Sequence, residues 1–151
     1  MSIGQEVFAI KLYELEQQYG KLQSRIRVCG KNNRRRIREE LQRAEEEYEE
    51  EHLLLQERVK NCRSRAVSRL AKAQLDYQKA TDESIKEQLA ADLHGENTTP
   101  GEDAQEASAL YAEFAIDFAT LATQQALIAA LSALDGQAEE TIEGKELQDE
   151  K

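Results

Sequence analysis

The chain has 151 residues, of which 33% are charged and 40% are hydrophobic, with one proline and no tryptophan. Abundant Glu, Lys, Arg, Leu and Ala with almost no proline is typical of long helices or coiled coils, and this apolar content is too high for general disorder. Few residues that favour strands are present. The sequence therefore predicts an all-α protein.

The net charge of −10 is unevenly distributed along the chain. Residues 1–75 carry 16 basic and 12 acidic side chains (net +4), whereas residues 76–151 carry 4 basic and 18 acidic side chains (net −14). An acidic total argues against sequence-independent coating of nucleic acid, although it leaves room for a local basic face.

The two cysteines, Cys29 and Cys62, lie far apart and form no C-x-x-C pair. This usage is typical of a reducing compartment. The N-terminal stretch lacks the charged start and the apolar run of a signal peptide. We therefore expect a cytoplasmic protein.

The first predicted helix covers residues 5–29. From Phe8 to Cys29 its apolar residues recur in steps of four and three, which is a heptad seam for packing against another helix. Gly30 is the residue type favoured just after a helix C-terminus, and the polar residues 31–33 follow it. We expect a tight turn between two antiparallel helices here; the alternative is one continuous helix of nearly ninety residues.

The second predicted helix covers residues 34–93. The same seam continues along it, and residues 41–90 contain neither glycine nor proline to interrupt it. Residues 94–101 then combine two glycines, a proline and small polar side chains, which predicts a loop.

The third predicted helix covers residues 103–135, with Thr99 or a neighbour as its cap and Glu102 and Asp103 as acids in its first turn. Residues 136–151 are acidic with two isolated apolar side chains, so we expect a disordered tail.

These lengths suggest one elongated domain over residues 1–135. The first helix would fold back along the first half of the second helix, and the third helix along its second half. The expected architecture is an antiparallel coiled-coil or helical-bundle rod with three helices, of which the central one is long and unbroken.

A rod two helices thick would leave apolar side chains in water, so a partner is expected. Three consecutive leucines, Leu53 to Leu55, surround more than half of one turn, and residues 114–134 carry Asp117 as their single charge. The residues that we expect at the dimer or partner interface are Leu53, Leu54, Leu55, Val59, Phe114, Phe118, Leu121, Ile128, Glu46, Glu47, Glu50, Arg65 and Arg69.

The charges of the second helix suggest a second copy as that partner. Residues 45–51 hold an acidic block, and residues 58–72 hold a basic block. Two copies that cross antiparallel between the blocks would place opposite charges side by side and complete four-helix bundles. We expect an antiparallel homodimer; an unidentified helical partner is the main alternative.

A basic cluster, Arg34, Arg35, Arg36 and Arg38, could contact phosphates. Each of two of these arginines has a glutamate four residues later, and no aromatic residue is nearby on which a base could stack. We expect a solvated face here and no nucleic-acid binding.

The chain has no pattern for a metal, a cofactor or catalysis. His52 and His94 are its two histidines, and it lacks the paired Glu-x-x-His motifs of a di-iron bundle. Its serines have no neighbouring histidine, and it has no glycine-rich phosphate loop. We expect no metal, no cofactor and no enzymatic activity.

The apolar residues 114–134 reach the length of a membrane span. Asp117 and the many Ala and Gln residues disfavour insertion, and no Lys or Arg closely flanks the segment. We expect no membrane contact.

The function that these patterns favour is a non-enzymatic, self-associating coiled-coil scaffold or adaptor that mediates protein–protein interaction. The alternative is a helical partner or export chaperone that binds another polypeptide through its apolar third helix. A nucleic-acid binder that uses the arginine cluster is less favoured.

Overall fold

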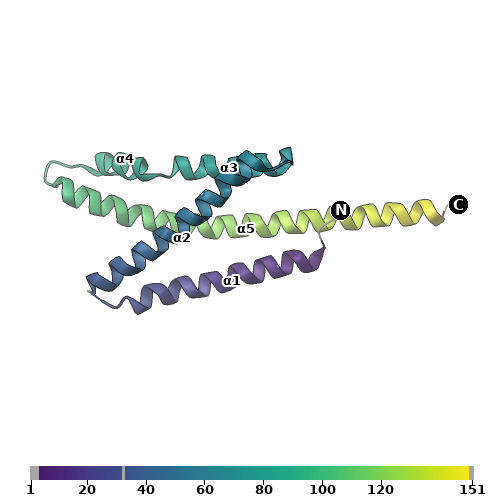
Figure 1. The fold of residues 1–151 in the computed structure, drawn as a ribbon, viewed down its shortest axis with the longest axis horizontal. Coiled ribbons are helices and arrows are strands. Elements are labelled where there is room, and N and C mark those ends of the chain that lie inside the picture. Colours follow the sequence, from purple (N-terminus) through teal and green to yellow (C-terminus); the bar gives the residue numbers. More distant parts are fainter. Residues whose placement is uncertain (1–3, 32, 150–151) are drawn as a thin grey trace. The chain divides into compact units, whose positions relative to one another are not determined.

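The computed structural model describes residues 4–31 and 33–149, and within these ranges every regular element is a helix. The all-α prediction is confirmed. In chain order the helices are α1 (Gln5–Val28), α2 (Arg34–Asn61), α3 (Arg65–Ala80), α4 (Glu83–Leu93) and α5 (Pro100–Asp149) (Figure 1). The chain divides into two compact units, which are described separately below.

The break expected after the first helix is confirmed, because α1 ends at Val28 and α2 begins at Arg34. Gly30 has a φ of 66°, which a residue without a Cβ adopts most readily. The side chain of Asn33 caps α2, since its Oδ1 atom accepts a hydrogen bond from the backbone N–H of Arg36 at 3.2 Å. Asn32, the remaining asparagine of the predicted turn, lies outside the described residues.

The prediction of one unbroken central helix over residues 34–93 is wrong. The structure has α2, α3 and α4 in its place, with interruptions after Asn61 and after Ala80. Each restart has its own cap: Ser64 Oγ accepts from the backbone N–H of Val67 at 3.3 Å, and Asp82 Oδ1 accepts from that of Ser84 at 3.0 Å. The breaks therefore coincide with capping side chains and not with glycine or proline.

At the first interruption the chain reverses, so α3 runs back along α2 as an antiparallel hairpin (Figure 1). The Ser68 hydroxyl donates to the carbonyl of Val59 at 3.1 Å, close to the turn. Further from the turn, His52 Nδ1 contacts Gln78 Oε1. The predicted rod therefore has no continuous central helix.

The N-terminus of α5 is fixed by a reciprocal pair of hydrogen bonds. Thr99 Oγ1 accepts from the backbone N–H of Glu102 at 3.2 Å, and Glu102 Oε2 accepts from that of Thr99 at 3.3 Å. This is a capping box, with Pro100 at the first helical position. The predicted loop, cap residue and first-turn acids agree with this geometry.

The C-terminal end of α5 differs from the prediction. We expected the helix to end at residue 135 and residues 136–151 to be disordered, but the structure continues α5 to Asp149. Gly136 disfavours a helix by about 1 kcal/mol relative to alanine, whereas the Gln, Ala and Glu residues that follow it are good helix formers. Residues 150–151 of the expected tail lie outside the described residues.

The first unit contains residues up to 27 and from 114 onward, so it pairs α1 with the second part of α5. The Tyr19 hydroxyl donates to the carbonyl of Ala119 at 3.2 Å and lies 3.0 Å from Thr123 Oγ1. Tyr19 belongs to the heptad seam of α1, so one seam residue contacts α5 within this unit. The expected packing of α1 on the second helix stays a prediction. No described residue of this unit is buried.

The second unit, residues 28–113, contains α2, α3, α4 and the first turns of α5. Its buried side chains are Ala71 and Leu75 on α3 and Asp103 and Ala107 on α5. The hydroxyl of Tyr111 on α5 donates to the carbonyl of Thr81 at 3.2 Å, which joins α5 to the α3–α4 junction. This is a small core, and three of its four members are apolar.

Candidate interaction surfaces and polar sites

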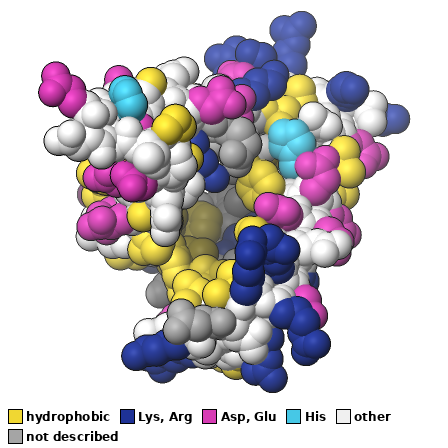
Figure 2. All heavy atoms as spheres, turned by 90° about the vertical axis from the view of Figure 1, so that its left-hand side faces the viewer, with side chains coloured by type: hydrophobic (Ala, Val, Ile, Leu, Met, Phe, Trp, Pro, Cys, Tyr) yellow, Lys and Arg dark blue, Asp and Glu magenta, His cyan; other side chains and the backbone are white. Residues whose placement is uncertain are grey.

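The second part of α5 carries large hydrophobic side chains that are exposed. Phe114, Leu121 and Ile128 are 64, 57 and 63% exposed, and Phe118 is also exposed. All four were predicted at an interface. Hydrophobic side chains also lie open among charged ones on the face drawn in Figure 2. Such surfaces are typical of sites that contact another molecule.

The three leucines of α2 differ in exposure. Leu53 and Leu54 are exposed, whereas Leu55 and Val59 are half-buried. Val59 lies in the hairpin with α3, where its carbonyl accepts from Ser68. Leu55 and Val59, two of these four predicted interface residues, are therefore partly covered by the chain itself.

The predicted charge blocks do not lie along one straight helix. Glu46, Glu47 and Glu50 are exposed on α2, and Glu46 Oε1 accepts from Gln42 Nε2 at 3.2 Å. Arg65 and Arg69 lie on α3, beyond the chain reversal. Two copies of α2 therefore cannot align acidic and basic blocks along a continuous rod as we expected.

The arginine cluster lies at the start of α2. Arg34, Arg35, Arg36 and Arg38 are all exposed there. Arg36 Nη1 donates to the carbonyl of Val28 at 3.3 Å, so it satisfies a free carbonyl at the end of α1. Arg35 Nε lies 3.6 Å from Glu39 Oε1 in an exposed ion pair. Two of the four cations thus have partners within the chain.

A cavity that the sequence did not indicate lies within the second unit. It has a volume of about 600 Å³, and its aromatic lining is Tyr48, Tyr77 and Tyr111. The Tyr48 ring stacks on the imidazole of His52, and Lys86 Nζ lies 5.3 Å from the centre of the Tyr111 ring. Burial and the neighbouring Tyr111 and Tyr77 raise the pKa of Tyr48. The three tyrosine rings come together because α3 reverses along α2. No spacing in the sequence predicts this arrangement.

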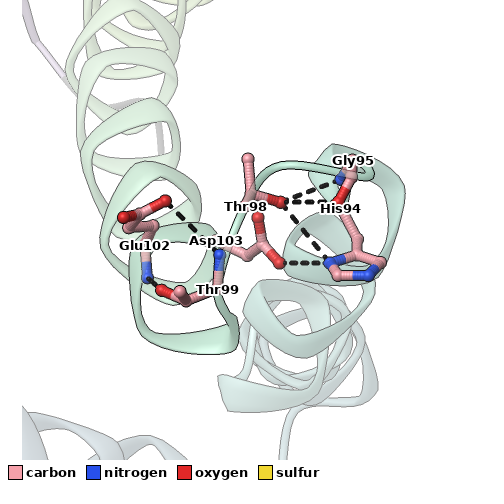
Figure 3. A network of polar contacts seen from close by, with 6 residues as sticks. All are labelled: His94, Gly95, Thr98, Thr99, Glu102 and Asp103. Carbon is pink, nitrogen blue, oxygen red and sulfur yellow. Dashed lines mark hydrogen bonds and ion pairs between the residues drawn. The ribbon is translucent and has the colours of Figure 1, made fainter.

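The loop between α4 and α5 contains a second polar cluster (Figure 3). His94 Nδ1 lies 2.7 Å from Asp103 Oδ2, and the Thr98 hydroxyl donates to the carbonyl of Gly95 at 3.1 Å. Asp103 is 3% exposed, and its Oδ1 atom has no hydrogen-bond partner among the described residues. The Thr98 hydroxyl and then the His94 imidazole hold the pKa of Asp103 below its usual value. This cluster fixes the loop on the start of α5.

Neither polar cluster supplies a metal centre. Over the described ranges, no group of three or more His, Cys, Asp or Glu side chains could hold a metal ion. Cys29 and Cys62 form no disulfide bond, and both are half-buried, at different helix ends.

One described helix, α5, is long and apolar enough to cross a membrane by length and composition, and none of its most apolar window is buried. Core helices of other proteins meet the same criterion, so this helix alone does not establish a membrane segment.

Comparison of the chain with protein families, with curated proteins and with solved structures finds no match.

Proposed function

We propose that the protein is a non-enzymatic, self-associating helical scaffold or adaptor of the cytoplasm. The proposal is supported above all by one observation. Three apolar side chains are buried among the described residues, whereas many large hydrophobic residues lie exposed along α1, α2, α3 and α5.

The energetics of folding explain why this contrast points to association. Fixing the backbone of each residue opposes folding by about 1–2 kcal/mol, and burial of apolar surface is the main term that offsets it. The side chains Ala71, Leu75 and Ala107 bury too little area for a chain of this length. Burial between chains supplies the difference in proteins that fold as they assemble.

The first unit supports the same proposal. It pairs two helices, and a helix pair covers one side of each helix, whereas four-helix bundles bury apolar residues around a shared core. A second helix pair from another copy would complete such a bundle. Homodimers with two-fold symmetry are the commonest form of association in soluble proteins.

Sedimentation velocity at micromolar concentrations tests the proposal. We expect a dimer whose dissociation on dilution is accompanied by loss of helical circular dichroism. A helical monomer over the whole concentration range would overturn the proposal.

A second candidate is a partner or export chaperone that binds another polypeptide through α5. The exposed apolar window of α5 favours it. In that case the purified chain would remain monomeric, and affinity purification from the native host would recover a stoichiometric companion.

Nucleic-acid binding through Arg34 to Arg38 remains a third, less favoured candidate. The affinity for nucleic acid would then fall steeply with added salt.

A further inference from the structure

The cavity among Tyr48, Tyr77 and Tyr111 lies wholly within the second unit. Tyr48 belongs to α2, Tyr77 to α3 and Tyr111 to α5, and α4 contributes Lys86 to the lining. Its volume of about 600 Å³ is in the range of sites that hold small molecules. Four helices of one unit thus form a complete cavity of ligand size.

Hydrogen bonds between neighbouring elements fix the walls of this cavity. His52 Nδ1 contacts Gln78 Oε1 across the hairpin, and Gln56 Nε2 lies 3.1 Å from His52 Nε2. An amide oxygen only accepts and an amide nitrogen only donates, so the imidazole has its proton on Nδ1 and carries no charge. The Tyr111 hydroxyl donates to the carbonyl of Thr81 at 3.2 Å. The walls are therefore in place before a ligand binds, which lowers the entropic cost of binding.

The aromatic side chains of the cavity present open ring surface. Tyr48 is 55% exposed and Tyr77 is 46% exposed, whereas Tyr111 is half-buried. Partial burial and then Tyr111 and Tyr77 raise the pKa of the Tyr48 phenol, so this ring is uncharged at neutral pH. A flat ring placed against these side chains would remove apolar area from water and gain ring–ring attraction.

The charged groups of the lining offer little to a charged ligand. They are two acids and two lysines, namely Glu49, Asp82, Lys79 and Lys86. The Asp82 carboxylate accepts from the backbone N–H of Ser84 at 3.0 Å, and Lys86 Nζ lies over the Tyr111 ring. Glu49 and Lys79 are exposed, where an ion pair contributes little. A charged ligand would therefore lose hydration without a matching gain.

We propose that this cavity binds a small, planar and uncharged aromatic compound that packs against the rings of Tyr48 and Tyr77. The inference goes beyond the scaffold role proposed above. It does not depend on self-association, because a single second unit contains the whole cavity.

Nuclear magnetic resonance of the natural chain with ¹³C-labelled tyrosine rings tests the site, with indole as the probe. The chain has five tyrosines, whose signals are assigned through single Tyr→Phe variants. Indole should shift the ring signals of Tyr48, Tyr77 and Tyr111 with one shared Kd of about 1 mM or lower. The signals of Tyr13 and Tyr19, which lie in the first unit, are the internal control and should not move.

Indole fluorescence gives a second measurement, because the chain has no tryptophan to obscure it. Tyr48→Leu should raise the Kd for indole at least about fivefold, since it removes a ring, and Tyr48→Phe should change it less than about twofold. Tyr13→Leu, at an exposed tyrosine of α1, is the matched control and should bind indole as the natural chain does. Circular dichroism checks that all three variants are helical.

Two charged analogues with the same ring test the class of ligand. Indole-3-acetate is an anion and tryptamine is a cation, and neither should bind more tightly than indole. An analogue that binds more than about tenfold tighter overturns the uncharged class, because the lining would then supply a counter-ion.

Other outcomes overturn the site itself. The absence of a saturable shift at Tyr48, Tyr77 and Tyr111 shows that the cavity holds no aromatic ligand. Equal shifts at Tyr13 and Tyr19 show adsorption on exposed apolar side chains instead. Equal affinity of Tyr48→Leu and the natural chain shows that indole does not pack on Tyr48.

Discussion

The Nδ1 atom of His94 lies 2.7 Å from the Oδ2 atom of Asp103, and this contact joins the end of α4 to the first turn of α5. The carboxylate is almost fully buried, whereas the imidazole is largely exposed. The Thr98 hydroxyl adjoins the same carboxylate, so the ionised form of Asp103 has two polar neighbours. Its lowered pKa follows from these neighbours, which outweigh the opposing effect of burial.

Asp103→Asn should have a lower free energy of unfolding than the natural chain at neutral pH, and this difference should disappear in acid. The folded-state pKa of Asp103 lies below its unfolded value, which is about 4. The ionised carboxylate therefore contributes its full stability above that value and loses it as the pH falls through the folded pKa. Thermal unfolding followed by circular dichroism across this range measures the effect. Asp92→Asn, at an exposed aspartate, is the control; an equal loss in both variants would contradict the prediction.

Gly30→Ala and Gly20→Ala should change stability in opposite directions. A Cβ at either position meets no atom within 4 Å, so the backbone decides the outcome. Gly30 has a φ of 66°, where an alanine is disfavoured by about 1–2 kcal/mol. Gly20 lies inside α1, where alanine is favoured by about 1 kcal/mol. Urea unfolding of both variants gives the two signs, and a shared sign would show that the turn after α1 is not as described.

The sequence predicts α1, the Gly30 turn and the loop before α5 well, because each depends on local chemistry. The seam from Phe8 to Cys29 depends on apolar residues three or four positions apart, and the left-handed turn depends on Gly30 alone. The same seam shows that α1 packs on a helix but not on which one. The partnership of Tyr19 with Ala119 spans a hundred residues of sequence, and no local pattern encodes it.

The breaks at Ser64 and Asp82 are harder to predict, although their signals are present. Both residues have short side chains with acceptors that can cap a helix, yet such residues also occur inside helices. The hydrogen bonds of Ser68 to Val59 and of His52 to Gln78 favour the reversal once α3 lies against α2. The cavity lined by three tyrosines is a consequence of that reversal, so sequence spacing could not predict it.

Ser64→Ala should lower the free energy of unfolding by about 1 kcal/mol, because the N–H of Val67 loses its capping acceptor. Ser64→Asn should retain most of the stability, since the asparagine side chain also caps helices well. Equilibrium denaturation of the two variants at the same protein concentration provides the comparison. A loss in Ser64→Asn as large as that in Ser64→Ala would indicate that capping does not define the start of α3.

Tyr19→Phe tests the pairing of α1 with α5. The change removes the hydroxyl that donates to the Ala119 carbonyl and meets Thr123 Oγ1, and it leaves the ring in place. A hydrogen bond of this kind contributes about 0.5–1.5 kcal/mol, and the partial exposure of Tyr19 places the expected loss near the lower end. Tyr13→Phe, at a more exposed tyrosine of the same helix, should change stability by a few tenths of a kcal/mol at most. Hydrogen exchange adds a local readout, because amides of α1 should exchange faster in Tyr19→Phe while those of the α2–α3 hairpin keep their protection. Equal stability of the two variants, with unchanged exchange in α1, would mean that α1 does not pair with α5 through Tyr19.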